Sequence, residues 1–383
     1  MSAVFLNRRQ WLLGMGAVPV CGWAGAGAPP KKDRVDIAMD RGAGFILKMQ
    51  EVNGAFNDPK ARESARNGYA MTALGLLALA SIGHQPSDPG KIGTSMGRAL
   101  DFILRDDPQR INLRGIFKGL DYFGSDGSRM YGHGITTLCL TEMMGMTTSK
   151  RQELKIRSVA QKAIALIMLS QAVKKSMPKY RGGWRYTPLS QDSDLSISVW
   201  QLMALRSAKN AGLAMKMTLA DNLLTGKAAI EEAVRYLKRS YFSPRDGRGM
   251  PVNMRSGCGY LPGQPPEFAT AAAGLLSLQV CGEYESPEVK GSAAWLSRQE
   301  VSTRLQWFYY GMYYYAQGMQ KREPVVADKA KQVTEDVLLK LQRADGSWDG
   351  HDGMERSAGR IYCTALAMLS LSVKYHYLPI YQH

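Results

Sequence analysis

Apolar residues follow a helical period along most of the chain, and the helices that they predict alternate in character. One kind has an apolar stripe on one side, as in EDVLLKLQ (335–342), which predicts a helix with one face in water. The other kind is apolar on all sides, as in GYAMTALGLLALA (68–80), and such a helix must be buried. The alternation therefore predicts pairs made of an outer and an inner helix.

Six such pairs are predicted, and three of them share a turn. In these three the outer helix ends near a glutamine, and a turn with a glycine and an aromatic residue follows. The other three pairs fit the plan more loosely. The glutamines are Gln50, Gln171 and Gln342, and the aromatic residues are Phe56, Trp184 and Trp348. The outer segments are 41–56, 94–105, 162–184, 227–239, 289–298 and 335–348, and the inner segments are 68–83, 131–146, 194–212, 267–282, 307–319 and 361–375.

The number and burial of these pairs indicate a closed architecture. Six hairpins with buried inner helices close naturally into a double ring, whereas an open solenoid needs polar capping repeats at its ends. Only a short tail, HYLPIYQH, follows the last helix, and no cap-like unit is visible. We therefore expect an all-α fold, an (α/α)6 toroid of six outer–inner helix pairs, as a single domain over residues 34–383.

The glutamine and aromatic turns resemble the QW repeats of the squalene–hopene cyclase and protein prenyltransferase superfamily. The stretches MYGHG, GGWRYTP, DSDLSISVWQLMALRSAKNAG, RADGSW and YLPIYQH are similar to those of exported bacterial proteins called prenyltransferase/squalene-oxidase repeat proteins. The resemblance covers essentially the whole mature chain and implies the terpenoid cyclase toroid. It does not imply one activity, because one fold hosts many functions.

The N-terminus has the features of an export signal. Arg8 and Arg9 precede a short apolar run, and Ala24-Gly25-Ala26 is similar to an A-x-A cleavage site. The order NRRQWLL resembles the twin-arginine signal, and an ordinary secretory signal is the alternative. We expect residues 1–26 to be a signal peptide and the mature protein to lie in the periplasm or cell envelope. No long apolar run elsewhere predicts a membrane span.

Positive charge is concentrated in one segment of a chain whose formal net charge is +16. Residues 150–185 contain ten lysines and arginines but one acid, Glu153. One interpretation is a solvated helix face with its loop. The other is a basic rim for an anionic partner, either anionic lipid or acidic polysaccharide. Export argues against nucleic acid as the partner.

Two acids, Asp192 and Asp194, stand at the predicted start of an inner helix. Squalene–hopene-type cyclases protonate their substrate with an aspartic acid of a D-x-D-D motif at such a place, and here Leu195 replaces the last aspartate. Three interpretations remain, namely helix capping, a ligand contact and proton donation. Prenyltransferases bind zinc through an Asp-x-Cys pair, but the comparable Asp194-Leu195-Ser196 has no cysteine. No cysteine or histidine spacing predicts another metal site or a cofactor.

The other candidate residues also lie near inner-helix starts. His133 is a candidate acid or base flanked by glycines, and Tyr131 is expected to point to the same mouth. A loop or cap hydrogen bond is the favoured alternative explanation of His133. An aromatic cavity wall would suit a glycan or an isoprenoid, and core packing is its alternative. The candidates for this wall are Trp184, Trp307, Tyr310, Tyr313 and Tyr314. Glu267 and Arg360 open two further inner helices, and in a toroid these helix starts would gather around one mouth.

Three functions are compatible with these residues. The first is a binding or interaction module that holds a ligand in the toroid cavity. The second is an isoprenoid cyclase-like enzyme that uses Asp192 or Asp194 as its acid. The third is a polysaccharide-active enzyme, which would need two carboxylates about 5–10 Å apart across a cavity.

Overall fold

The computed structural model describes residues 31–61, 67–147 and 149–382, so the predicted signal peptide at 1–26 lies outside the described residues. Within these ranges the chain forms fourteen α-helices and one two-stranded sheet, and the predicted all-α class is confirmed. None of the described helices has both the length and the apolar character needed to cross a membrane.

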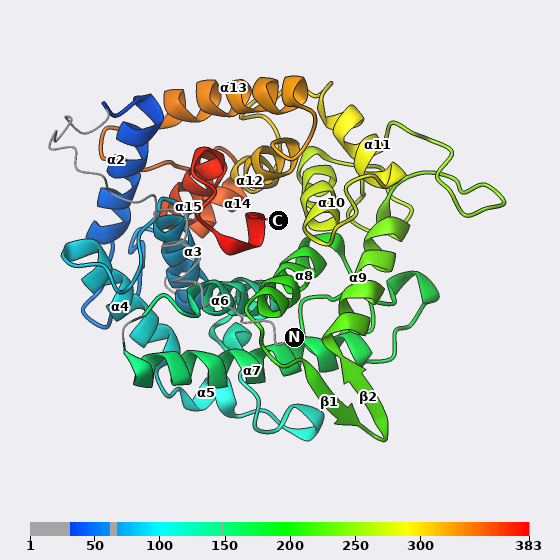
Figure 1. Cartoon of the computed structure of the whole chain (residues 1–383), viewed down its shortest axis with the longest axis horizontal. Helices are drawn as coiled ribbons and strands as arrows, with labels where there is room; N and C mark the ends of the chain where they lie inside the picture. Colours follow the sequence, from blue (N-terminus) through cyan, green and yellow to red (C-terminus); the bar gives the residue numbers. More distant parts are fainter. Residues whose placement is uncertain (1–30, 62–66, 148, 383) are drawn as a thin grey trace, which may run out of the picture.

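Six helices form an inner layer that is buried on all sides. In α3, for example, every residue from Tyr69 to Ser81 is buried, as its uniformly apolar sequence predicts. Each inner helix packs against the next one along the chain, and the last packs against the first (Figure 1). The inner helices are α3 (Gly68–Ser81), α6 (Arg129–Met143), α8 (Leu195–Asn210), α10 (Phe268–Val280), α12 (Phe308–Met319) and α15 (Arg360–Leu371).

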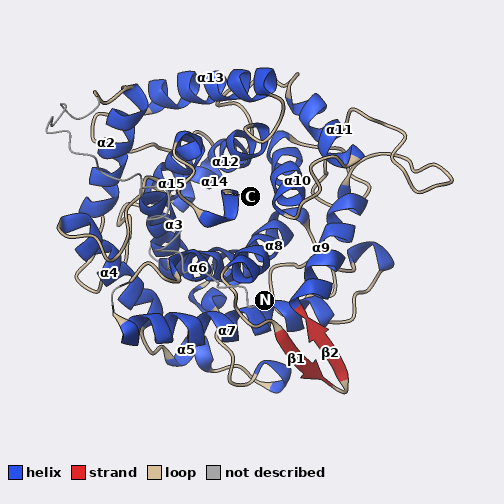
Figure 2. Cartoon of the chain, viewed as in Figure 1, coloured by secondary structure: helices blue, strands red, loops and turns tan. Residues whose placement is uncertain are grey.

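Six more helices form a layer around the first (Figure 2). In α13 the buried residues Ala327, Ala330, Thr334 and Leu338 follow the spacing of one helix face, whereas α7 is buried nearly all round near its C-terminal end. The outer helices are α2 (Arg34–Lys48), α4 (Lys91–Leu104), α7 (Lys150–Ala172), α9 (Gly226–Ser240), α11 (Pro287–Leu296) and α13 (Pro324–Leu341). α7 begins twelve residues before the segment that the repeat pattern assigns to it, with Ser149 as its N-cap.

Short elements occupy the connections between the layers. The strands β1 (Lys216–Leu219) and β2 (Asn222–Thr225) form an antiparallel hairpin before α9, which the sequence pattern did not predict. The short α-helices are α5 (Pro108–Ile111) and α14 (Gly353–Ala358). The 3-10 helices are η1 (Gly115–Phe117), η2 (Phe123–Asp126), η3 (Pro178–Tyr180), η4 (Ser372–Lys374) and η5 (Pro379–Tyr381).

The glutamines of the three repeated turns join neighbouring outer helices. Gln171 Nε2 donates to the carbonyl of Gly182 in its own turn, at 2.8 Å, and to the carbonyl of Ala229 in α9, at 2.9 Å. Because Gly182 has φ +80° and a Cβ there would lie 2.2 Å from the Glu232 carbonyl, only glycine fits. Gln50 makes the same two bonds to Gly54 and Ser95, and Gln342 makes them to Gly346 and Ala38. Gln342 therefore ties the last outer helix to the first.

The aromatic residues of these turns join the outer helix to its inner partner. The indole Nε1 of Trp184 donates to the Ile167 carbonyl of α7 at 2.8 Å, and the Trp184 backbone N–H donates to Ser198 Oγ of α8 at 2.9 Å. Trp348 makes the equivalent bonds to Leu338 and Thr364. Trp184 is thus a buried joint between the two layers.

The C-terminal tail packs inside the inner layer, near the ends of its helices (Figure 1). The hydroxyls of Tyr381 and Tyr313 of α12 are hydrogen-bonded, and Lys321 Nζ donates to the Tyr381 carbonyl at 2.8 Å. The Ile380 N–H donates to Glu142 Oε2 of α6 at 3.3 Å. The opposite ends of the inner helices, where they begin, carry most of the candidate residues.

Candidate functional site at the start of α8

Asp194 is the N-cap of α8. Its backbone is extended, its N–H donates to the Trp184 carbonyl at 2.9 Å, and its Oδ1 accepts from the Ile197 N–H at 2.8 Å. A side chain that accepts a bond from the third residue of the helix satisfies one of the free N–H groups there. The structure therefore shows the capping role that the sequence favours for Asp194.

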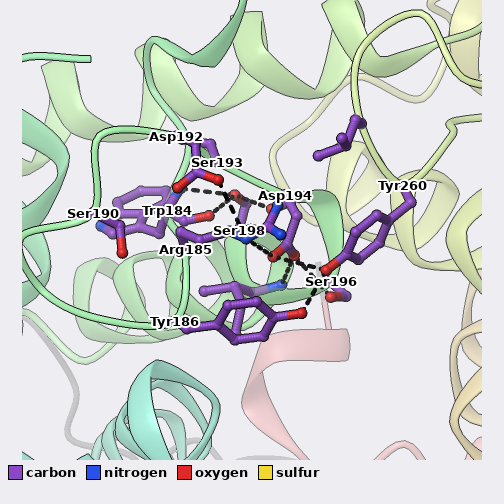
Figure 3. Close-up of polar contacts among 12 residues, drawn as sticks. Trp184, Arg185, Tyr186, Ser190, Asp192, Ser193, Asp194, Ser196, Ser198 and Tyr260 are labelled. Carbon is purple, nitrogen blue, oxygen red and sulfur yellow. Dashed lines mark hydrogen bonds and ion pairs between the residues drawn. The ribbon is translucent and has the colours of Figure 1, made fainter. Parts of the chain in front are cut away.

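The Asp194 carboxylate has three further partners, although its side chain is fully buried (Figure 3). Ser196 Oγ donates to Oδ1 at 2.8 Å, Tyr260 OH donates to Oδ2 at 3.2 Å, and Arg185 Nε lies 3.3 Å from Oδ2. Burial has the largest effect and raises the pKa of Asp194 above its ordinary value, although all four partners oppose this rise because they stabilise the charged form.

Tyrosine hydroxyls extend this network on both sides of the carboxylate. Tyr260 OH is 2.6 Å from Tyr186 OH, and Tyr131 OH of α6 is hydrogen-bonded to Ser196 Oγ. Tyr310 OH of α12 donates to the Ser196 carbonyl at 3.4 Å. The site thus joins three inner helices with the loops before α8 and α10, and it includes the predicted wall residues Tyr131 and Tyr310.

Arg185 connects the buried carboxylate to the solvent-facing part of the site. Its guanidinium carbon lies 4.8 Å from the Tyr186 ring centroid and 5.5 Å from that of Tyr260, which is the geometry of a cation–π contact. Arg185 Nε is also 3.6 Å from Asp192 Oδ2, and the Asp192 side chain is 45% exposed. Asp192 and Asp194 therefore share one cation but differ sharply in burial.

His133 lies on the opposite side of α6 from Tyr131. Its Nδ1 accepts from the Phe123 N–H at 3.3 Å, and its Nε2 is 3.1 Å from the Ala163 carbonyl of α7. Burial lowers the pKa of His133 to about 4, so the ring is neutral near pH 7. Both ring nitrogens are engaged by backbone groups, which matches the loop hydrogen bond offered as the alternative explanation of this residue.

Two other predicted site residues lie at the starts of inner helices, outside this network. Arg360 pairs with Asp58 at 3.4 Å and with Asp345 at 2.8 Å, and its guanidinium lies over the Phe45 ring of α2. The contacts of Arg360 thus face the outer layer. Glu267 is exposed at the N-cap of α10, where its backbone N–H donates to Thr270 Oγ1 at 3.1 Å.

The aromatic run of α12 divides between core and site. The Trp200 ring stacks on Tyr313 with centroids 5.8 Å apart and meets Tyr314 edge-on at 5.7 Å. Trp307 precedes the helix with φ 54°, a conformation that is strained for a bulky residue, and its N–H donates to Asp352 Oδ2 at 3.0 Å. Tyr313 and Tyr314 are therefore core residues, whereas Tyr310 reaches the Asp194 network.

Sequence reasoning missed a second buried acid, Glu355 of α14. Its Oε1 accepts from the N–H groups of Tyr309 at 2.8 Å and Tyr310 at 3.5 Å, at the start of α12. Its Oε2 is buried and has no hydrogen-bond partner among the described residues. Burial raises the pKa of Glu355 to about 8, so this carboxyl group holds its proton near neutral pH. The polar stretch DGMERSA gave no sign of this burial.

No group of three or more histidine, cysteine, aspartate or glutamate side chains suited to a metal ion occurs in the described ranges. Cys139, Cys258, Cys281 and Cys363 are all free, and burial raises the pKa of the Cys258 thiol to about 12. Comparison with known protein families and with curated proteins gives no match to this chain. Its function must therefore be argued from the residues themselves.

Proposed function

We propose that the protein is an exported, squalene cyclase-like repeat protein with an (α/α)6 toroid fold. Two observations support the fold. The contacts between inner helices return from α15 to α3, and the Gln342 amide links the last outer helix to the first. The equivalent bonds of Gln50, Gln171 and Gln342 support a repeated Gln–aromatic unit of the QW kind.

Within this architecture, the protein acts as a binding module whose ligand lies against Arg185, Tyr186 and Tyr260. The observation that carries this proposal is that a buried carboxylate, Asp194, holds a partly exposed arginine and a pair of phenols in fixed positions. The Arg185 side chain is 21% exposed, and both tyrosines are partly buried. Fixed donors next to aromatic faces suit a hydroxyl-rich ligand such as a glycan.

Proton donation by Asp194 is the weaker explanation of this geometry. A general acid must hold its proton until the substrate takes it. Burial raises the pKa of Asp194 and favours the protonated form, but each of its four partners favours the charged carboxylate and opposes this rise. Hydrolysis by Asp192 and Asp194 is also disfavoured, because both carboxylates lie against the same arginine, at 3.6 Å and 3.3 Å from its Nε.

The test is native mass spectrometry, with glycan and lipid extraction, on mature protein purified from its own cell envelope. We expect a bound glycan. Tyr260→Phe should then weaken rebinding about fivefold, because one hydrogen bond to a positioned hydroxyl contributes roughly 1 kcal/mol. Tyr377→Phe, in the exposed tail, is the matched control. Equal rebinding by both variants would show that the ligand does not bind at Tyr260.

An isoprenoid cyclase-like enzyme is the second candidate, and Glu355 is the observation that favours it. A buried carboxyl group that keeps its proton near neutral pH, beside Tyr309 and Tyr310, has the protonation state that a general acid needs. This enzyme becomes the favoured function if an isoprenoid co-purifies with the protein and if Glu355→Gln abolishes product formation. Unchanged product from that variant would remove Glu355 as the acid.

A further inference from the structure

A cavity of about 380 Å³ lies in the outer layer, and none of its lining residues belongs to the Asp194 network. It is formed by the end of α7, the turn that follows it, strand β2 and the start of α9, next to the hairpin drawn in red in Figure 2. This volume is within the range of small-molecule pockets in proteins. The cavity is therefore large enough for a ligand of modest size.

One side of this cavity is apolar. Met168 and Ala172 of α7 line it together with Leu224 of β2 and Ala228 and Ala229 of α9. Leu223, at the edge of the cavity, is 65% exposed, which leaves a large apolar side chain in water. An apolar ligand group would remove this surface from water, at about 25 cal/mol for each Å².

Other residues of the lining are positively charged. They are Lys174, Lys175 and Arg181, and none of the three forms an ion pair with a described residue. The Lys175 ammonium donates to the backbone carbonyls of Ser190 at 3.0 Å and Asp192 at 3.3 Å. The one acid at the cavity, Glu232, already receives a 2.8 Å bond from Arg235. Elsewhere in the basic segment, Lys155, Arg157 and Arg185 are neutralised by nearby acids. Three cations thus line the cavity against one acid among the described residues, and the cavity keeps a net positive charge although Glu232 offsets part of it.

Two further features add to this positive potential. Thr225 lines the cavity and is the N-cap of the fifteen-residue helix α9, so the positive end of the helix dipole is at the cavity. Arg239 of α9, behind the lining residue Arg181, donates to the Arg181 carbonyl, and its buried Nε has no hydrogen-bond partner in the described part of the chain. Each feature favours an anion on this side.

We propose that this cavity binds an anionic amphiphile. The carboxylate or phosphate head lies among Lys174, Lys175 and Arg181, and the acyl chain lies along Met168, Ala172 and Leu224. Charge complementarity selects the head, and the exposed edge of β2 receives the chain. Such a ligand has two possible sources, a free fatty acid or alkyl phosphate and the headgroup region of an anionic membrane. This proposal does not depend on the function of the Asp194 site.

The test measures binding of dodecanoate, dodecyl phosphate and dodecanol to the full mature chain by titration calorimetry. We expect saturable binding of the two anions and at least tenfold weaker binding of dodecanol. The variant Lys174→Gln/Arg181→Gln should lose about tenfold or more in affinity for the anions. The control Lys150→Gln/Arg151→Gln removes the same charge from the other end of α7 and should bind normally. All four side chains are exposed, so thermal unfolding should not change.

A second measurement separates the two sources. Flotation with phosphatidylglycerol and phosphatidylcholine vesicles reports membrane binding by the same variants. Binding of free anions, or of phosphatidylglycerol vesicles alone, supports the site when the Lys174/Arg181 variant loses it and the Lys150/Arg151 variant keeps it. Equal loss in both variants, equal affinity for dodecanol, or no binding in either measurement would overturn the proposal.

Discussion

Asp194 and Glu355 are both fully buried carboxyl groups beside the start of an inner helix, yet their surroundings differ. Asp194 has an arginine, two hydroxyls and a backbone N–H as partners. Glu355 has backbone N–H groups on one oxygen, and its other oxygen has no hydrogen-bond partner within the described ranges. Burial raises the pKa of both groups, but only Asp194 has a cation that stabilises its charge. Burial is the largest influence on both pKa values, so the two acids differ in their partners and not in the direction of the shift.

The largest effect is expected from Asp194→Ala. This change removes the cap of α8 and leaves Arg185 without its buried partner, and losing one member of such a pair is strongly destabilising. We expect a loss of about 4 kcal/mol in the free energy of unfolding, measured by urea denaturation.

The more conservative Asp194→Asn keeps an acceptor for Ile197 and should lose about half as much. If Asp194→Ala costs less than about 1 kcal/mol, the ion pair with Arg185 contributes little, and the contrast with Glu355 fails.

Glu355→Gln tests the role of the second buried acid through the dependence of stability on pH. The folded-state pKa of Glu355 is about 8, above the ordinary value of 4.5. The folded protein therefore holds a proton that the unfolded chain has released, and stability falls as pH rises from about 4.5 to about 8. Glutamine carries no titrating proton, so the variant should lack this fall, which we expect to be on the order of 3 kcal/mol.

The measurement is urea denaturation at pH 5 and pH 8 for the wild-type chain and the variant. Glu231→Gln, at an exposed position of α9, is the control and should keep the wild-type slope. A wild-type chain equally stable at both pH values would show that Glu355 is charged in the folded state.

The helical layers could be predicted because each leaves a pattern in its own sequence. Inner helices such as α3 are apolar on every side, and the turns at Gln171 and Gln342 place a glycine and a tryptophan at similar points. The all-α class and the cap at Asp194 followed from such local signals. The hairpin β1–β2 has too few residues for a clear alternation, and it was missed.

The candidate site was only partly predictable, because its partners come from distant segments. Tyr260 is 66 residues from Asp194, and no local pattern connects them. Simple helix geometry could have predicted the placement of His133. Two residues apart on a helix are about 200° apart around its axis, so His133 and Tyr131 face opposite sides of α6. Glu355 was hidden because its neighbours in sequence are polar.

Tyr260→Phe should change the free energy of unfolding less than Asp194→Ala or Glu355→Gln does. It removes one hydrogen bond to Asp194 and one to Tyr186, but it keeps the ring that packs against Arg185. Since Asp194 retains three partners, we expect a loss of about 1 kcal/mol in unfolding free energy by urea denaturation. A loss as large as that of Asp194→Ala would mean that Tyr260, rather than Arg185, holds the site together.

The smallest effect is expected from Asp192→Asn, although Asp192 and Asp194 look alike in sequence. The Asp192 side chain is 45% exposed and lies 3.6 Å from Arg185, so water screens this contact. We expect a change below about 0.5 kcal/mol in urea denaturation. Arg185 keeps its buried partner in this variant, and the bonds that Asp192 makes through its backbone carbonyl to Lys175 are unaffected. Equal losses at Asp192 and Asp194 would show that the two acids act as one pair, and burial would then not distinguish them.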